Sequence, residues 1–524
     1  MISVSESWKN AHQGLLLPES FLEISVGFAD PEARDLVTAS SDSNAVFSNL
    51  PNVVGDIDTP SPAYYATMEH NLWVLDGSRS IVPDAAPYKT PGYASTDDTE
   101  GNILLTLPEV RNQAIPGFII TWSSEYGEYP TAFTVEARNG HAVIAAISVT
   151  DNASNVTEVP LEITGYDQVE INVQEWNTPD HRVRIDRVYF GHIFAFGKHD
   201  VLSYTHEQYG NLLSGELPKS SISFSLDNVD GKWNPQNPTG LGKYLSERQM
   251  VTVRYGLSVD SAIEWIKAGT FYLSEWRTPS NGMAASFTAR DIFEFMLNEE
   301  YTGITSGTAE AIIRTALDSS SLPTSFEASL DSSLNSVDIV IPSQPYKTAE
   351  VIQMCANAAR CVIYQDRDGV LRIEPLEITP TGYVIGSFLS YTHPEVELSK
   401  PLRSVSVSYG DQVYALNVAG SGETQTVNNP FVTTQEDAEG IALWVRDMLE
   451  QRSTVTGEFR ANPCLDVFDV VTVESKYGVI PAVVLTNIKY SYSGSFRASY
   501  SGRTVAVETS NELDEFILDS SMLS

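Results

Sequence analysis

The residues best suited to chemistry in this sequence form an acidic run, Asp227, Asn228 and Asp230, followed by Gly231. A calcium loop places oxygen ligands at alternating positions before a glycine and a bidentate glutamate six residues after it. Here the spacing is D-N-x-D-G, and residue 237 is Asn. The run therefore fits a turn that ends a strand better than a metal site. We expect no metal and no other cofactor.

Patterns typical of catalysis are missing from the sequence. It contains no HExxH, GxxxxGK[ST] or GxSxG motif, and Gly240-Leu241-Gly242-Lys243 is followed by Tyr244 where a phosphate loop needs Ser or Thr. The 68 Asp and Glu residues are too numerous for an acid and base pair to be chosen without geometry. We therefore expect no enzymatic activity, and a glycan-cleaving enzyme is kept only as an alternative.

Aromatic side chains near expected strand ends offer a second kind of site, one that binds sugar. A flat ring stacks on the apolar face of a sugar while nearby Asp and Asn side chains bind its hydroxyl groups. Large aromatic residues more often fill cores, and this alternative stays open for each ring. Trp176 is the best candidate for an exposed ring because Asn177, Pro179 and Asp180 are typical of a loop. The candidate carbohydrate-binding residues are Trp73, Trp122, Tyr126, Tyr129, Trp176 and Asp180.

The charge of the chain is strongly negative. Its 68 acidic residues exceed its 32 Lys and Arg residues, which gives a formal net charge of −36. Electrostatic repulsion therefore opposes binding to nucleic acid, which depends on cations that neutralise phosphates. The excess either keeps the protein soluble or forms an acidic wall along which DNA slides without sticking, and composition does not separate the two.

The spacing of the cysteines and the first residues of the chain indicate the cellular compartment in which the protein assembles. Cys355, Cys361 and Cys464 form neither a CxxC motif nor a pair with histidine, so we expect no disulfide framework and no zinc site. Residues 1–20 lack the apolar core of a signal peptide, and no stretch reaches about 18 apolar residues, the length of a membrane span. We expect assembly in a reducing cytoplasm.

Alternating apolar and polar residues predict mostly strands in the first 300 residues. Residues 19–29 predict one early strand that needs a partner from elsewhere in the chain. The stretch from about 60 to 195 predicts strands separated by polar turns, as in a β-sandwich or jelly roll. Further strands follow to about residue 300, including SISFSLDN at 221–228. We expect residues 19–29 to join these later strands, so that the sandwich is an insertion.

Helices are expected mainly after residue 300, where polar caps precede apolar stripes. The caps and helices are Thr308 for 309–317, Thr348 for 349–360, and Thr433 with Glu436 for a helix reaching about Arg452. Residues 361–375 predict a hairpin that turns at Asp368-Gly369.

Two long stretches carry a resemblance to a known family. Residues 204–256, YTHEQYGNLLSGELPKSSISFSLDNVDGKWNPQNPTGLGKYLSERQMVTVRYG, and residues 269–296, GTFYLSEWRTPSNGMAASFTARDIFEFM, resemble hub proteins of the tail tip or baseplate of tailed bacteriophages. ATMEHNLWVLDGS at 66–78 and HRVRIDRVYFG at 181–191 resemble the lead-in and the last strand of a galactose-binding-like sandwich inserted in some members. The resemblance covers roughly residues 60 to 400.

This resemblance implies a mainly β (α+β) fold, with hub β-barrel domains, an inserted β-sandwich (jelly roll) and a mixed α/β domain. The implied domains are residues 1–58 with 196–300 as the first hub barrel, 59–195 as the inserted sandwich, 301–400 as the mixed α/β domain, and 401–524 as the second hub barrel and C-terminal β domain. Trp233 and the prolines near it are expected to stiffen the turn after residue 228 for a subunit contact.

The resemblance also implies a role and partners. Hub proteins of this kind form homotrimers around the tail axis, close the distal end of the tail tube and line part of the DNA passage. The implied partners are other copies of the chain, the distal tail or tube protein and fibres, with DNA only in transit. The sandwich would either attach to a host surface glycan or brace neighbouring tail proteins. The expected location is the virion, after assembly in the host bacterial cytoplasm.

Two further alternatives stay open. One is a free carbohydrate-binding protein of the lectin kind, with the sandwich as its working part. The other is a different tail adaptor, such as a distal tail protein.

Overall fold

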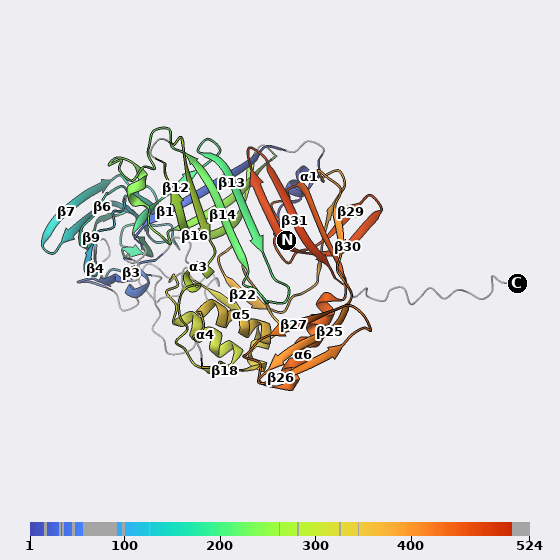
Figure 1. The fold of residues 1–524 in the computed structure, drawn as a ribbon. Helices are drawn as coiled ribbons and strands as arrows, with labels where there is room; N and C mark the ends of the chain where they lie inside the picture. Colours follow the sequence, from blue (N-terminus) through green and yellow to red (C-terminus); the bar gives the residue numbers. More distant parts are fainter. Residues whose placement is uncertain are drawn as a thin grey trace.

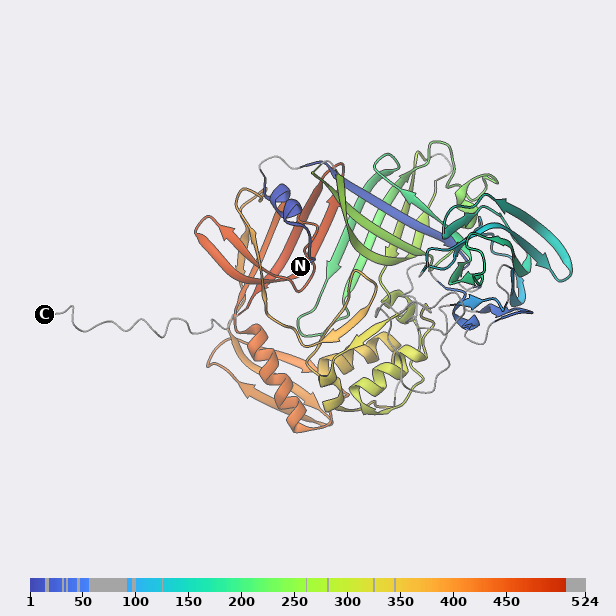
Figure 2. The same cartoon turned by 180° about the vertical axis from the view of Figure 1, so that it is seen from behind.

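The computed structural model describes the 524-residue chain except residues 15–17, 31–32, 34–35, 45–47, 56–91, 97–99, 125, 261, 280–281, 324–325, 344 and 506–524. The described part is mainly β, as expected, and its strands form one sheet of 13 strands and six smaller sheets. Figures 1 and 2 show the large sheet with a sandwich at one end and the helices of residues 293–449 gathered beneath it, whereas α1 (Glu6–Gln13) lies near the top. None of the described helices is long and apolar enough to cross a bilayer.

The first half of the large sheet contains the early strand. Ile24 of this strand pairs with Phe196 on one side and with Val253 on the other. The prediction that residues 19–29 join the later strands is confirmed. The strands of this first sheet half, in spatial order, are β12 (Gly191–Phe196), β1 (Ser20–Ala29), β15 (Met250–Val259), β16 (Ala262–Arg277), β17 (Ala284–Arg290), β14 (Lys219–Asp227) and β13 (Val201–Tyr209).

The second sheet half continues the first without a break. β13 pairs antiparallel with β30 from Tyr204↔Tyr492 to Tyr209↔Asn487, and one hydrophobic core lies under both halves. The strands of the second sheet half are β30 (Gly478–Tyr492), β31 (Phe496–Thr504), β28 (Ser453–Arg460) and β24 (Glu395–Leu398), with β29 (Val470–Ser475) beside β30 and β23 (Pro380–Ile385) beside β29.

The sandwich is inserted between β1 and β12, where Ala29 and Gly191 face each other as a strand pair. Its core includes Val53, and β2 pairs with β4, so the sandwich begins before the boundary expected at residue 59. The segment 66–78 that resembles a lead-in lies outside the described residues. The strands are β2 (Thr38–Ser40), β4 (Gly101–Arg111), β9 (Tyr166–Trp176), β6 (Pro130–Asn139) and β7 (Ala142–Thr150) in one sheet, β11 (Arg187–Tyr189), β5 (Phe118–Thr121) and β8 (Val156–Val159) in another, and the pair β3 (Tyr93–Ala94) and β10 (Arg184–Ile185), with a short 3-10 turn η1 (Leu50–Asn52).

A mixed α/β body lies beneath the large sheet (Figure 2). Its core joins α4 and α5 to β25 and α6, although β25 and α6 come after the boundary expected at residue 400. In turn β23 and β24, which come before that boundary, pair with strands of the second sheet half. The elements are α3 (Phe293–Met296), β18 (Ser306–Thr308), α4 (Ala309–Asp318), β19 (Ala328–Leu330), η3 (Ser332–Ser336), β20 (Asp338–Val340), α5 (Thr348–Ala358), β21 (Val362–Gln365), β22 (Leu371–Glu374), β25 (Leu402–Tyr409), β26 (Gln412–Asn417), β27 (Glu423–Asn428) and α6 (Gln435–Leu449).

The helix caps follow the expected chemistry with small shifts. Thr308 caps α4 by accepting a hydrogen bond from the Ala311 N–H at 3.3 Å. The predicted cap Thr348 is instead the first residue of α5. α6 is capped by Thr434, which accepts from the Asp437 N–H at 3.1 Å. The sequence predicted Thr433 as the cap, because Thr433 with Glu436 and Thr434 with Asp437 both fit the capping pattern, one residue apart.

Candidate functional site

The acidic run after β14 builds a turn with its own oxygen atoms. Asn228 Oδ1 accepts a hydrogen bond from the Trp233 N–H at 2.9 Å, and Asn228 Nδ2 donates to the Gly282 carbonyl at 3.3 Å. Asp230 Oδ1 accepts from the Lys232 N–H at 3.1 Å. Side chains that would have to face a metal ion are therefore used to fold the backbone, as the turn interpretation predicts.

Trp233 lies inside the molecule. Its side chain is fully buried, and its ring lies 4.9 Å from Phe287 and 5.3 Å from Phe196, centroid to centroid. Trp233 holds the turn from inside the molecule, because its ring closes the core of the first sheet half, and the subunit contact expected of this turn stays a prediction. The turn continues into η2 (Leu241–Tyr244), where Lys243 Nζ reaches Glu162 Oε1 of the sandwich at 2.7 Å.

Two of the candidate sugar-binding rings belong to the sandwich core. Trp122 is 0% exposed, and its indole N–H donates to Thr157 Oγ1 at 2.9 Å. Trp176 is 7% exposed and donates to Glu128 Oε2 at 3.1 Å. Trp176 ends β9 instead of lying in the predicted loop, since the loop begins one residue later. Neither ring offers a face to a sugar, and the core alternative holds for both.

Three other candidates lie at the surface near this core, while Trp73 lies outside the described residues. Tyr126 and Tyr129 are partly buried and Asp180 is exposed. The guanidinium group of Arg184 lies 5.5 Å from the centre of the Tyr126 ring. The Tyr129 N–H donates to Asn177 Oδ1 at 3.2 Å, which ties the loop carrying both tyrosines to the loop carrying Asp180. Sugar binding by these three residues stays a prediction.

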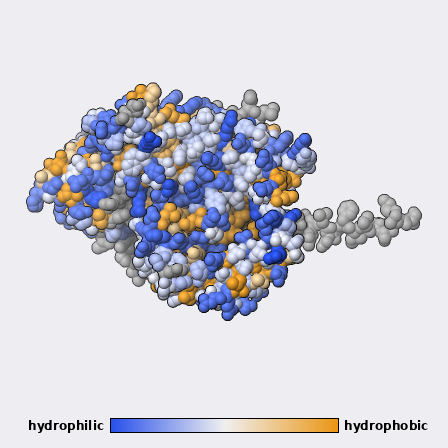
Figure 3. Space-filling view, in the orientation of Figure 1, coloured by the Kyte–Doolittle hydropathy of each residue, from blue (hydrophilic) through white to orange (hydrophobic). Residues whose placement is uncertain are grey.

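The outward face of the large sheet carries small hydroxyl side chains across both sheet halves. The apolar residues of β14 point into the core, so its serines point outward. Ser223 pairs with Thr288 of β17 on one side and with Thr205 of β13 on the other, and Thr205 pairs in turn with Ser491 of β30. This hydroxyl face comprises Ser203, Thr205, Ser221, Ser223, Ser225, Ser286, Thr288, Ser491, Ser499 and Ser501. Figure 3 shows pale, weakly hydrophilic residues over β13 and β14.

Charges on the hydroxyl face have both signs. Glu207 Oε2 lies 3.7 Å from Lys489 Nζ across the joint between β13 and β30. Arg290 of β17 lies 3.2 Å from Glu275 of β16. This face also carries the exposed side chains of Arg277, opposite Ser286, and Arg497, opposite Ser491. It is therefore a hydroxyl surface with charges of both signs and not a uniformly acidic wall.

The large sheet ends in a short edge strand with the sequence Glu-Val-Glu-Leu. All four residues of β24 are exposed, and among the described strands β24 pairs only with β28. Val396 lies opposite the fully buried Val455, so it faces the core side of the sheet, yet it is 47% exposed. Leu398, on the same side, is 65% exposed. This edge has unpaired backbone groups and uncovered apolar side chains, the features of a strand that accepts a further strand.

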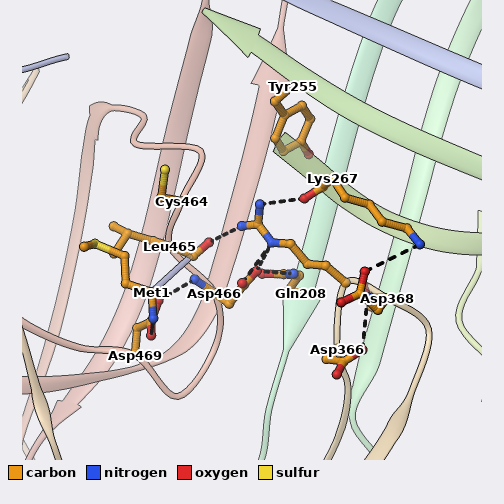
Figure 4. Close-up of polar contacts among 12 residues, drawn as sticks. Met1, Gln208, Tyr255, Lys267, Asp366, Asp368, Cys464, Leu465, Asp466 and Asp469 are labelled. Atoms are coloured by element: carbon orange, nitrogen blue, oxygen red, sulfur yellow. Dashed lines mark hydrogen bonds and ion pairs between the residues drawn. The ribbon is translucent and has the colours of Figure 1, made fainter. Parts of the chain in front are cut away.

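A buried ion pair holds the middle of the sheet. Arg367, in the turn between β21 and β22, donates from Nε to Asp466 Oδ2 at 2.9 Å (Figure 4). The same guanidinium group donates to the Lys267 carbonyl at 3.0 Å and to the Leu465 carbonyl at 3.1 Å. One side chain of the α/β body therefore binds both sheet halves, because Lys267 belongs to the first and Leu465 precedes strands of the second. Gln208 of β13 adds a bond to Asp466 Oδ1 at 3.0 Å.

Aromatic and imidazole groups extend this network into the core. His206 Nδ1 lies 2.8 Å from the Tyr255 hydroxyl, which lies 2.9 Å from the Tyr204 hydroxyl. Burial, reinforced by the charge of Arg367, lowers the pKa of His206 to about 3, so the ring is neutral. The Tyr490 hydroxyl donates to the Leu465 carbonyl at 2.6 Å. The sequence did not single out Arg367, because Asp-Arg-Asp-Gly has the composition of an ordinary hairpin turn.

Comparison with solved structures finds similarities to tail proteins. No family model and no curated protein matches the chain. A tail protein from Neisseria meningitidis MC58 is similar over 59% of this chain and 93% of its own, with TM-score 0.43 and 10% identity. The 43 kDa tail protein of prophage MuSo2 from Shewanella oneidensis covers 59% and 94%, with TM-score 0.42 and 13% identity.

A second similarity concerns a smaller part of the chain. A chitosan-binding module from a chitosanase/glucanase of Paenibacillus sp. IK-5 matches 30% of this chain and 93% of its own, with TM-score 0.20 and 12% identity. The chain is thus similar to phage tail proteins over more than half of its length, and the similarity to the chitosan-binding module is weaker.

Proposed function

We propose that this chain is a non-enzymatic structural component of a phage tail tip or baseplate hub, which closes the distal end of the tail tube and lines part of the DNA passage. The resemblance of residues 204–256 and 269–296 to hub proteins supports the role in the tail. The observation that carries the passage is the hydroxyl face, which runs unbroken from β17 through β31. Its expected setting is the virion, after assembly in the host cytoplasm.

The chemistry of the hydroxyl face suits a surface past which DNA moves. Serine and threonine keep a wall hydrated and offer only weak, exchangeable hydrogen bonds to phosphate oxygens. Free lysines or arginines would hold phosphates and release counterions, which gives tight and salt-dependent binding. On this face Lys489 lies near Glu207 and Arg290 near Glu275, so two of its cations are matched by carboxylates. Arg277 and Arg497 are the further exposed cations, and they lie toward opposite ends of the face.

The edge of the large sheet suggests how copies would surround a passage. The sheet runs from β12 at one end to β24 at the other, and each pairs with one neighbour among the described strands. Joining β24 of one copy to β12 of the next is a head-to-tail contact, and such contacts form a ring when the rotation from copy to copy closes. The resemblance implies three copies in the ring. At the distal end of the tail tube, the chain would also contact the distal tail protein and fibres.

Light scattering on the purified full chain tests the ring. A mass of three copies is expected, and replacing Val396 and Leu398 together by lysine should leave single copies, because charges would replace both apolar side chains on the core side of the edge strand. Val413→Lys, at a 62% exposed valine of β26, is the matched control and should keep the native mass. A native mass in the edge variant, or a single copy in the unmodified protein at high concentration, would count against this assembly.

The passage itself is tested in particles of the phage that encodes the chain. Ser223→Lys combined with Ser225→Lys puts two cations among neutral hydroxyl neighbours, and DNA ejection should slow markedly while tails still assemble. The Val413→Lys particles should eject normally. Equal ejection rates in the two variants, or a tail-end map that places this chain away from the axis, would overturn the proposal.

A second role, binding of host glycan, has one observation in its favour. Tyr126, Tyr129 and Asp180 lie on two joined loops at the surface of the sandwich. A glycan array probed with the full chain and with Tyr129→Ala tests it, with Tyr477→Ala, at a 92% exposed tyrosine of the second sheet half, as control. Binding that Tyr129→Ala removes and Tyr477→Ala keeps is expected. Absence of binding to every surface sugar would leave the sandwich the role of bracing neighbouring tail proteins.

A further inference from the structure

A cavity of about 540 Å³ lies where the two sheet halves meet the α/β body. Its wall includes Gln208 of β13 and Thr270 of β16 from the first half and the turn 466–469 from the second. Tyr364 and Glu374, on the hairpin of β21 and β22, come from the α/β body. Figure 4 shows the residues around this meeting point, with Gln208 beside Asp466 and Met1 beside Asp469. The space is large enough for several water molecules or for a small organic group.

The lining carries more negative than positive charge. The cations among the lining residues are Arg367 and the amino group of Met1, and these pair with Asp466 and Asp469 respectively. Asp366 pairs with Arg372 Nε at 2.7 Å. Glu374 accepts a hydrogen bond from the Tyr364 hydroxyl at 2.6 Å. The six carboxylates of the wall are Asp331, Asp366, Glu374, Glu377, Asp466 and Asp469.

Two buried polar side chains in the same wall have oxygen atoms without a partner. Gln208 is 8% exposed and Thr270 is 5% exposed. Among the described residues, neither Gln208 Oε1 nor Thr270 Oγ1 has a hydrogen-bond partner. Buried polar atoms are normally paired, and leaving one unpaired costs roughly 1–3 kcal/mol. The Gln208 Oε1 atom calls for an N–H or O–H donor, and the Thr270 hydroxyl can accept a hydrogen bond from the same donor or donate one of its own.

We propose that this cavity binds an organic cation, an alkylammonium or guanidinium group. Such a group supplies several N–H donors on one positive centre, which matches the excess carboxylates and the two unpartnered oxygens. An anion would meet the charge of the wall unfavourably. A metal ion fits less well, because no three His, Cys, Asp or Glu side chains of the described residues come together as a set that could hold one.

The cation could come from a free polyamine or from a Lys or Arg side chain of a neighbouring protein, and the chemistry at the cavity is the same. Bound there, the cation would touch both sheet halves and the α/β body at once and so hold them in one arrangement. The site does not depend on the proposed role in a phage tail, and failure of one leaves the other standing.

Titration calorimetry on the full chain at low ionic strength tests the proposal. Spermidine and agmatine are the free cations, an N-acetylated Gly-Arg-Gly amide stands for a protein side chain, and butane-1,4-diol is the uncharged control. At least one cation should bind at one site per chain, and the diol should not bind. Preference for the free amines indicates the polyamine source, and preference for the peptide indicates a side chain.

The variant Glu374→Gln with Glu377→Gln removes two charges from the wall while keeping hydrogen-bond acceptors. Its affinity should be about five to ten times weaker, the sum of two partly exposed ion pairs. Glu327→Gln, an exposed residue of the same body outside the cavity, is the matched control and should bind as the native chain does. No cation binding by the native chain, or equal loss in the control, would overturn the proposal, and unchanged thermal unfolding verifies that each variant is folded.

Discussion

The middle and the end of the large sheet differ in how their strands are paired and how their apolar side chains are covered. At the joint of β13 and β30, strands from distant parts of the chain pair directly, and Arg367 ties both halves to the α/β body. At β24 the sheet stops, with Val396 and Leu398 uncovered on its core side. The joint is complete within one chain, whereas the described edge strand β24 pairs on one side alone. In the proposed assembly, internal stability and contacts between copies would therefore depend on different strands of one sheet.

The largest effect is expected from the ion pair at the joint. Arg367→Met leaves the Asp466 carboxylate without its cation and should lower the free energy of unfolding by about 3–5 kcal/mol. Urea unfolding followed by tryptophan fluorescence measures this. Adding Asp466→Asn should recover part of the loss, since no uncompensated charge then remains. If Arg367→Met were as stable as the native chain, the joint would not differ from the edge in the way described.

A second test separates polar from apolar contributions near the joint. Trp233→Ala should cost about 3 kcal/mol or more, because it empties a buried site between Phe196 and Phe287. Trp233→Phe should cost much less, since the indole N–H has no hydrogen-bond partner among the described residues and its removal offsets part of the lost packing. The two variants are compared in the same urea experiment. Equal losses would contradict this account of the ring.

The joint should also respond to pH. Burial lowers the pKa of His206 from 6.5 to about 3, and that of His12, which lies beside Ala461, to about 4. The unfolded chain then binds more protons below pH 6.5, so the free energy of unfolding falls as pH falls from 6.5 toward 4. Burial raises the pKa of Asp291 to about 7, which opposes this trend between pH 4 and 7.

His206→Gln isolates the contribution of that ring. It keeps hydrogen-bonding groups toward Tyr255 and Ser220 but does not titrate. The slope of the unfolding free energy between pH 4 and 6 should decrease by up to about 1.4 kcal/mol per pH unit. A matching loss at every pH, with no change in slope, would mean that the ring acts only through packing.

The smallest effect on stability is expected at the edge. Leu398→Lys changes a 65% exposed side chain and should alter the free energy of unfolding by less than about 0.5 kcal/mol. The same substitution should weaken self-association, as measured by sedimentation at several concentrations. A large loss of stability without a change in association would mean that β24 stabilises the fold, as the joint of β13 and β30 does, and does not contact a neighbouring copy.

Strand pattern alone predicted much of the fold. The alternation in SISFSLDN correctly predicted which side chains of β14 are buried, and the isolated early strand found its partners in β12 and β15. Asp368-Gly369 correctly marked a hairpin, and Gly369 has φ of 92°, which glycine tolerates best. These features are local, or follow from the need to bury one face of one strand.

The candidate sites were harder to predict because they depend on register between distant segments. Ser223 and Ser491 become neighbours only through the pairing of three strands, so no local pattern predicts the hydroxyl face. Trp176 was placed in a loop because polar residues follow it, yet the bond from its indole to the buried Glu128 favours the core. The same limit applied to Trp233, whose buried neighbours come from β1, β12 and β17.

The facing pair Ala29↔Gly191 gives the sandwich an unusual freedom. Because the two points where it leaves and re-enters are neighbours, β1 and β12 would form an ordinary hairpin if a short turn replaced everything between them. In evolution, another domain could thus replace the sandwich at this position, with the loss of only a few polar contacts such as that of Lys243 with Glu162. The inserted domain could then change while the pairing and the core of the large sheet stay as they are.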